Sequence, residues 1–132
     1  MPHLSIEYSS NLDVLADIGG LCRALSDEIA AIGLYPLGGI RVRAFLARDH
    51  AIADHHPDNA FADMVFRIAA GRSLDDRKRT GERLMAVAGR HFARQLAGPH
   101  FALSLEIVEI AAETSWKFNT IHARLTAAAK PS

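Results

Sequence analysis

The sequence predicts a single α/β (α+β) domain made of two β-α-β units in tandem. Alternating apolar and polar residues mark four strand segments, apolar residues at helical spacing mark two segments between them, and glycine or proline ends each helical segment. The first unit covers residues 2–47, the second covers residues 60–110, and a tail completes the single domain of residues 1–132. We expect a four-stranded sheet with both helices on one face and right-handed crossovers between parallel strands.

The first unit begins with a strand over residues 2–8, in which every second residue is apolar. Apolar residues then recur at helical spacing over residues 18–32, between a capping Asp17 and a terminating Gly33. The stretch GIRVRAFLA, residues 39–47, alternates again and predicts the second strand.

The second unit repeats this order after a polar segment, residues 48–59, which predicts a connecting loop with room for a short hairpin. Residues 60–70 predict the third strand, and Ser73 with Asp76 forms a capping signature at the start of the second helix. We expect the buried face of this helix to consist of Leu84, Met85, Ala88, Phe92 and Leu96. A Gly-Pro pair ends the helix, and residues 101–110 predict the fourth strand.

The tail, residues 111–132, and the uncovered face of the sheet complete the prediction. Residues 114–125 show no strong periodicity, and we expect residues 127–132 to fray. Large side chains remain for the face without helices: Arg41, Phe45, Phe66 or Phe61, and Trp116. Because a partly apolar sheet face is stable only when it is covered, we predict an oligomer.

Composition excludes several classes of protein. Fifteen basic and fifteen acidic side chains cancel, so the chain lacks the basic surplus typical of nucleic-acid-binding proteins. No apolar stretch is long enough to span a membrane, and the first residues do not resemble a secretory signal. The single cysteine, Cys22, excludes an internal disulfide and suits a reducing compartment. We therefore expect a cytoplasmic protein that binds neither nucleic acid nor membrane.

Pro2 is a candidate catalytic residue because of its place directly after Met1. If the initiator methionine is removed, Pro2 becomes a free secondary amine. Such an amine acts as a general base only when its pKa lies near the working pH. Burial and neighbouring cations both lower that pKa, because they disfavour the charged form.

Three arginines are candidates for binding an anion. Arg41 and Arg43 are two residues apart on a predicted strand, so their side chains share a sheet face. Arg72 lies where the third strand turns into the second helix, and we expect parallel strands to bring this turn to the edge of the sheet where ligands bind. Because a guanidinium binds a carboxylate with two parallel hydrogen bonds, these residues suggest an anionic or dianionic ligand.

The loop of residues 48–59 contains His50, His55 and His56 together with three aspartates. These residues lack the spacing of known zinc or iron sites, so we predict a polar loop and no metal centre.

Several stretches carry a family resemblance. PHLSIEYS with Asn11, YPLGGIRVRA, AFADMVFRIAAGRS and WKFNTIHARL follow one another over nearly the whole chain. Together they resemble the 5-carboxymethyl-2-hydroxymuconate isomerases, members of the tautomerase superfamily that work with an amino-terminal proline. The resemblance implies a tautomerase-like homotrimer with active sites near the subunit interfaces and with no cofactor or metal.

The resemblance also implies a reaction: isomerisation of a muconate-type dienol dicarboxylate to its conjugated ketone, during bacterial breakdown of 4-hydroxyphenylacetate by the homoprotocatechuate route. Carried onto this sequence, Pro2 is the general acid-base. Arg41 and Arg72 bind carboxylates and stabilise the charge that develops on the substrate. Arg43 belongs to the same motif and is a further substrate-binding candidate.

The chain departs from the family pattern at Asp63, where histidine is frequent, at Thr120, where asparagine is frequent, and in the loop sequence ADHHPDN. These departures concern the identity of the substrate more than the chemistry. Two alternatives remain open: a related tautomerase for another small unsaturated 2-keto acid, and a trimeric module that binds a carboxylate without catalysis.

Overall fold

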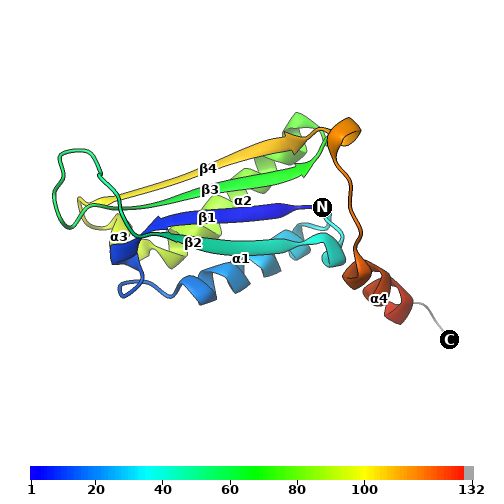
Figure 1. Ribbon diagram of the computed structural model, residues 1–132, viewed down its shortest axis with the longest axis horizontal. Helices are drawn as coiled ribbons and strands as arrows, with labels where there is room; N and C mark the ends of the chain where they lie inside the picture. The colour runs from blue at the N-terminus through cyan, green and yellow to red at the C-terminus, as the bar shows by residue number, and fades with distance from the viewer. Residues whose placement is uncertain (130–132) are drawn as a thin grey trace.

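The computed structural model describes residues 1–129, which form a four-stranded sheet with two long helices against one face (Figure 1). The long elements are β1 (His3–Ser9), α1 (Ile18–Ile32), β2 (Arg41–Ala47), β3 (Ala60–Ala69), α2 (Leu74–His91) and β4 (Phe101–Ile110). The strand order is β2-β1-β3-β4; β1 is parallel to β2, β3 is parallel to β4, and β1 is antiparallel to β3. The predicted pair of β-α-β units in one sheet is confirmed.

Side-chain caps fix the starts of both long helices. The Asp17 carboxylate accepts a hydrogen bond from the Gly20 amide at 2.9 Å, and the Ser73 hydroxyl accepts one from the Asp76 amide at 3.1 Å. Gly33 ends α1 with a φ of 82°, a left-handed conformation that glycine adopts without steric cost. These local signals explain why α1 has the predicted boundaries.

The core lies between the sheet and the helices, and it corrects part of the predicted face of the second helix. Leu84, Ala88 and Phe92 are fully buried, as predicted. Met85 and Leu96 were predicted to be buried and are 36% and 47% exposed. Met85 lies at the open groove between α2 and the edge strand β4. Leu96 belongs to a separate short helix, α3 (Ala93–Leu96). The buried face of α2 was predicted to include Leu96, but α2 ends before this residue.

The connecting segments differ from the prediction in two places. Residues 48–59 form turns and no hairpin. The tail contains a 3₁₀ turn, η3 (Ala112–Thr114), and a helix, α4 (Thr120–Ala129). Two further 3₁₀ turns, η1 (Ser10–Leu12) and η2 (Leu37–Gly39), lie in the first unit. The expectation of fraying is therefore wrong for residues 127–129, which are helical, and residues 130–132 lie outside the described part of the chain. Among the described residues, no helix is long and apolar enough to cross a bilayer.

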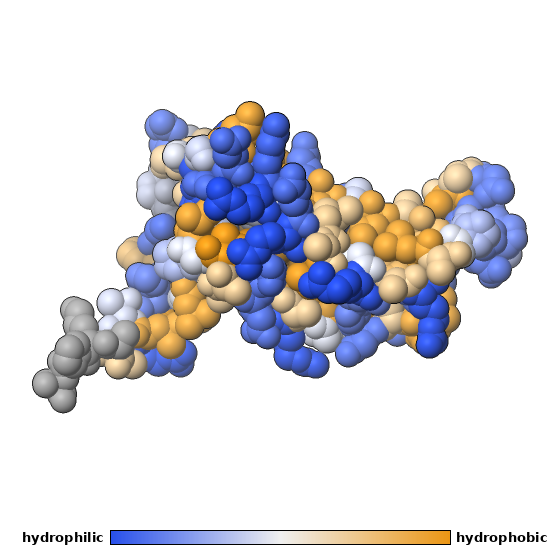
Figure 2. Space-filling view, turned by 180° about the vertical axis from the view of Figure 1, so that it is seen from behind, coloured by the Kyte–Doolittle hydropathy of each residue, from blue (hydrophilic) through white to orange (hydrophobic). Residues whose placement is uncertain are grey.

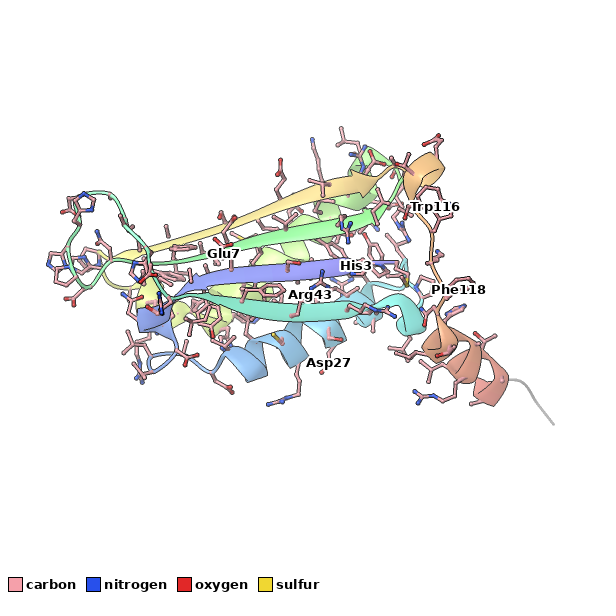
Figure 3. The ribbon with its side chains drawn as sticks, viewed as in Figure 1. His3, Glu7, Asp27, Arg43, Trp116 and Phe118 are labelled. Atoms are coloured by element: carbon pink, nitrogen blue, oxygen red, sulfur yellow. The ribbon has the colours of Figure 1, made fainter. Side chains whose placement is uncertain are left out.

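The second face of the sheet, which we call the open face, carries no helix. Phe61 lies on it, whereas Phe66 is fully buried in the core on the helix side. Figure 3 shows His3, Glu7 and Arg43 on the strands of this face. Its basic and acidic side chains are His3, Arg41, Arg43 and Arg67, and Glu7, Asp63 and Glu106. The basic group lies near the start of β1 and the acidic group further along the sheet.

The opposite side of the molecule carries the two long helices. Seen from behind, hydrophilic side chains are intermixed with hydrophobic ones (Figure 2). Polar residues of the exposed helix surfaces contribute to this mixture, and one of them, Arg83, donates to the Glu28 carboxylate at 2.8 Å between α2 and α1.

Candidate active site

Four chain segments meet at one end of the sheet, where the N-terminus and α4 lie (Figure 1). The parallel pairing of β1 and β2 puts the starts of both strands at this end. The antiparallel pairing of β1 and β3 brings the end of β3 to the same place, with Arg67 opposite His3. The sequence predicted that parallel strands bring the Arg72 turn to the ligand-binding edge of the sheet. Because β1 and β3 are in fact antiparallel, the end of β3 with Arg72 lies beside the start of β1 with Pro2.

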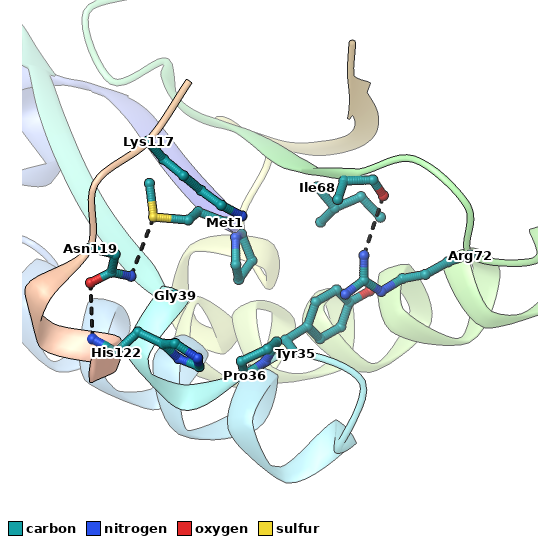
Figure 4. A pocket seen from close by; sticks show the side chains of 11 residues that line it. Met1, Tyr35, Pro36, Gly39, Ile68, Arg72, Lys117, Asn119 and His122 are labelled. Atoms are coloured by element: carbon teal, nitrogen blue, oxygen red, sulfur yellow. Dashed lines mark hydrogen bonds between the residues drawn. The ribbon is translucent and has the colours of Figure 1, made fainter. Parts of the chain in front are cut away.

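A pocket of about 230 Å³ lies at this end of the molecule (Figure 4). It is lined by Met1, Pro2, Tyr35, Pro36, Gly39, Ile68, Ala69, Arg72, Lys117, Asn119 and His122. None of these lining residues is acidic, whereas Arg72 and Lys117 are cationic. The pocket is therefore suited to a small anion with an apolar body.

Pro2 is buried at the base of this pocket. Its carbonyl accepts a hydrogen bond from the Arg41 amide at 3.0 Å, which ties it to the start of β2. A side chain on Gly39 would place its Cβ 3.1 Å from Pro2 Cδ, so glycine is what allows the close approach of this turn. While Met1 is attached, the Pro2 nitrogen is an amide without basicity.

The α-amino group of Met1 shows how an amine behaves at this place. Burial lowers its pKa most, and the positive charges of Lys117, Arg72 and Arg41 lower it further. The Met1 amine is thus neutral at a lower pH than an ordinary chain terminus.

Arg72 is held in a fixed position beside the pocket. Its guanidinium donates to the Leu34 carbonyl at 2.9 Å and to the Ala69 carbonyl at 3.3 Å. It also stacks over the ring of Tyr35, with 4.4 Å between the guanidinium carbon and the ring centroid. The hydroxyl of Tyr35 is itself hydrogen-bonded to buried Thr80 at 3.0 Å. This chain of contacts orients Arg72 without neutralising its charge.

Arg41 and Arg43 share a sheet face, as predicted, but neither lines the pocket that contains Pro2. Arg41 donates to the Gly39 carbonyl at 2.9 Å, at the rim of the pocket. Arg43 lies further along β2, where its Nη1 contacts His3 Nδ1 at 3.1 Å. Both arginines line a separate hollow beside α1. The described chain therefore brings Pro2 together with Arg72, with Arg41 adjacent and Arg43 outside.

Comparison with known proteins identifies the family. A model of the family described as 5-carboxymethyl-2-hydroxymuconate isomerase matches residues 2–125. The 5-carboxymethyl-2-hydroxymuconate Delta-isomerase of Escherichia coli is 38% identical over 123 residues, which cover 93% of this chain and 98% of that protein. The chain belongs to the 5-carboxymethyl-2-hydroxymuconate isomerase family. The resemblance seen in the sequence is thus confirmed.

Solved structures agree with this family membership. The crystal structure of a 5-carboxymethyl-2-hydroxymuconate isomerase from Deinococcus radiodurans R1 superposes with a TM-score of 0.88 at 40% identity, covering 94% of this chain and 93% of that one. A fused 4-OT protein, described as a symmetric trimer, superposes with a TM-score of 0.60 at 16% identity, covering 86% of this chain and 91% of that one. This more distant likeness shows the tautomerase fold alone.

Sequence reasoning missed four polar residues that line the pocket of this isomerase family member: Tyr35, Lys117, Asn119 and His122. Three of them lie in the tail motif WKFNTIHARL, which carried part of the resemblance but to which no role was given. Tyr35 lies in the equally distinctive YPLGG. Both motifs are visible in the sequence, but only the fold shows that they lie at the start of β1 and line the pocket.

The histidine loop lies at the opposite end of the sheet. His56, Asp58 and His100 offer possible ligand atoms within 4.8 Å of one another. However, the His56 and His100 rings are stacked, with centroids 4.1 Å apart and an angle of 25° between planes. The closeness of these groups therefore includes a direct stacking contact between the two rings. His50 contacts the Ser10 hydroxyl at 3.3 Å instead, apart from this cluster.

Proposed function

We propose that this chain isomerises 5-carboxymethyl-2-hydroxymuconate to its conjugated ketone, with Pro2 as the general acid-base after removal of Met1. The observation that carries the proposal is the buried Pro2 in a pocket with Arg72 and without an acidic lining residue. Family membership supplies the identity of the substrate. The name of this substrate implies two muconate carboxylates and a third on the carboxymethyl branch, one more than a simple dicarboxylate.

In the proposed reaction the neutral Pro2 amine takes the proton of the 2-hydroxyl group. The electron pair of the O–H bond forms the 2-oxo group, and the double bond between C2 and C3 moves to C3 and C4. The electrons of the double bond between C4 and C5 then take a proton at C5 from the prolinium. The proton moves from oxygen to carbon with no net change in composition, so one residue can act first as base and then as acid.

Arg72 supports this chemistry as a fixed positive charge. A dienolate intermediate is more negative near its oxygens than the bound dienol, and a preorganised cation stabilises it without reorienting. We propose that Arg41, at the rim of the same pocket, contributes a second cation for a carboxylate. Arg43 remains a candidate for substrate binding, but it does not line this pocket and would contact only a part of the substrate that extends beyond it.

We further propose that the chain works as a cytoplasmic homotrimer and takes part in bacterial breakdown of 4-hydroxyphenylacetate. The uncovered open face supports an oligomer, and the fused 4-OT protein of the same fold is described as a symmetric trimer. The proposed reaction uses no cofactor and no metal.

The test combines mass spectrometry with an ultraviolet assay of dienol isomerisation. We expect the purified chain to lack Met1 and to convert 5-carboxymethyl-2-hydroxymuconate faster than simpler 2-hydroxymuconates. Pro2→Ala should lower kcat by about two to four orders of magnitude, because general acid-base catalysis contributes about that factor. The variant should keep the oligomeric state of the wild type.

Three outcomes would contradict parts of this proposal. Retention of Met1 in all molecules would exclude Pro2 as a base and favour a module that only binds carboxylates. Near-normal activity of Pro2→Ala would show that another group is the base. Faster turnover of a different unsaturated 2-keto acid would favour the related tautomerase.

A further inference from the structure

Lys117 is a second cation of the pocket, and it comes from a different part of the chain than Arg72. It belongs to the extended segment of residues 115–119 that leads from η3 to α4. Figure 4 shows the end of Lys117 beside Met1 and Arg72 on another side of the pocket, next to Tyr35. The effect of Lys117 on the pKa of the Met1 amine exceeds that of Arg72, which supports its closeness to this end of the chain.

The segment that carries Lys117 is anchored rather than loose. Asn119 donates to the Gly38 carbonyl at 2.8 Å, and its side-chain oxygen accepts from the His122 amide at 3.0 Å at the start of α4. Gly38 lies so close to His122 that a Cβ there would be 2.4 Å from His122 Cα. The anchor at Asn119 follows Lys117 by two residues and therefore limits how far its side chain can move from the pocket.

Lys117 has no acidic partner among residues 1–129, since none of the ion pairs in this part of the chain includes it. An unpaired ammonium next to an apolar pocket is suited to bind an anionic group of a ligand. Arg72 also lines the pocket, so two separate cations are available to a ligand with two carboxylates.

We propose that Lys117 is a specificity-determining residue that binds the substrate carboxylate lying away from Arg72. This inference rests on the proposed function, because it takes the carboxylates at the two ends of the ligand from that substrate. Lys117 gives the pocket a means to prefer acids with a carboxylate at each end over acids with a single carboxylate.

The test measures binding of two probes that differ by one carboxylate. Adipate and hexanoate have the same chain length, and each is titrated by calorimetry into protein whose loss of Met1 has been verified by mass. We expect Lys117→Met to weaken adipate binding by about 10- to 100-fold, the usual effect of losing a hydrogen bond between charged groups. Hexanoate binding should change by less than about threefold, and Lys117→Arg should retain most of the adipate affinity.

Lys78→Met is the matched control, because Lys78 is an exposed lysine of α2 away from this pocket and its loss changes the net charge equally. In steady-state kinetics with 5-carboxymethyl-2-hydroxymuconate, Lys117→Met should raise KM more than it lowers kcat. An unchanged adipate affinity, or equal weakening of adipate and hexanoate, would overturn the role of Lys117. Absence of isomerase activity in the wild type would instead contradict the proposed function, while the two-probe comparison would still report on Lys117.

Discussion

The nitrogen of Pro2 is reactive in the proposed mechanism only in its neutral form. At pH values below the amine pKa the nitrogen is protonated and cannot accept a proton from the dienol. Burial and the charges of Lys117, Arg72 and Arg41 lower the pKa of the Met1 amine, and we expect the same surroundings to lower the pKa of a free Pro2 amine. The acidic limb of the pH profile of kcat/KM should therefore lie below the ordinary range of an amino terminus.

Replacing Arg72 tests this electrostatic effect. Arg72→Met removes a positive charge that disfavours the protonated amine, so the protonated form of Pro2 becomes more stable and its pKa rises. The acidic limb of kcat/KM should then shift to higher pH, in addition to a fall in kcat/KM at its maximum. Arg72→Lys keeps the charge and is the control. An acidic limb that stays at the wild-type pH in Arg72→Met would show that Arg72 does not tune the base.

Elements with strong local signals could be predicted from the sequence, and elements that depend on tertiary packing could not. The Asp17 cap and Gly33 define α1, and alternation defines β4 over residues 101–110. By contrast, α4 has only a weakly amphipathic sequence and is stabilised by Asn119 and by its contact with η2. The same limit applies to the site. Pro2 and Arg72 could be predicted from their residue types and positions in the sequence, whereas Lys117 could be recognised as a pocket residue only from the fold, which brings the tail beside β1.

The contact between α4 and η2 leads to a prediction at the scale of these elements. In Gly38→Ala the new methyl group would meet His122 Cα at 2.4 Å, and backbone at that distance must move. We expect α4 and the segment with Lys117 to be displaced, which should raise KM about 10-fold and increase limited proteolysis between residues 111 and 119.

Gly89→Ala is the control for this change, since a Cβ at Gly89 in α2 meets nothing within 4 Å. Alanine in a helix interior is more favourable than glycine by roughly 0.5–1 kcal/mol, so this variant should be slightly more stable with unchanged KM. Wild-type KM and proteolysis in Gly38→Ala would show that α4 is not needed to position Lys117.

At the scale of the whole molecule, the open face is where the proposed trimer can form. Val65 lies near its centre, beside Ser5 on β1 and Glu106 on β4. In an isolated subunit, a lysine at position 65 is exposed to solvent and lies beside Glu106 of the same chain, so the fold should persist. In a trimer the same ammonium would be buried at an interface, which costs several kcal/mol per ion unless it is well paired.

We therefore expect Val65→Lys to sediment as a monomer with a far-ultraviolet circular dichroism spectrum like that of the wild type. Ala86→Lys, on the exposed surface of α2, should leave the oligomeric state unchanged. A Val65→Lys protein that sediments like the wild type would place the subunit interface elsewhere.

The burial of Pro2 behind Met1 also affects how the protein can be prepared for study. Any affinity tag fused before Met1 would leave the Pro2 nitrogen as an amide, and it would keep Met1 in the pocket that it lines. Such a preparation would fold normally and still be inactive in the proposed reaction. A tag placed after Ser132 avoids this problem, because it leaves the amino terminus free for the removal of Met1 that the proposed function requires.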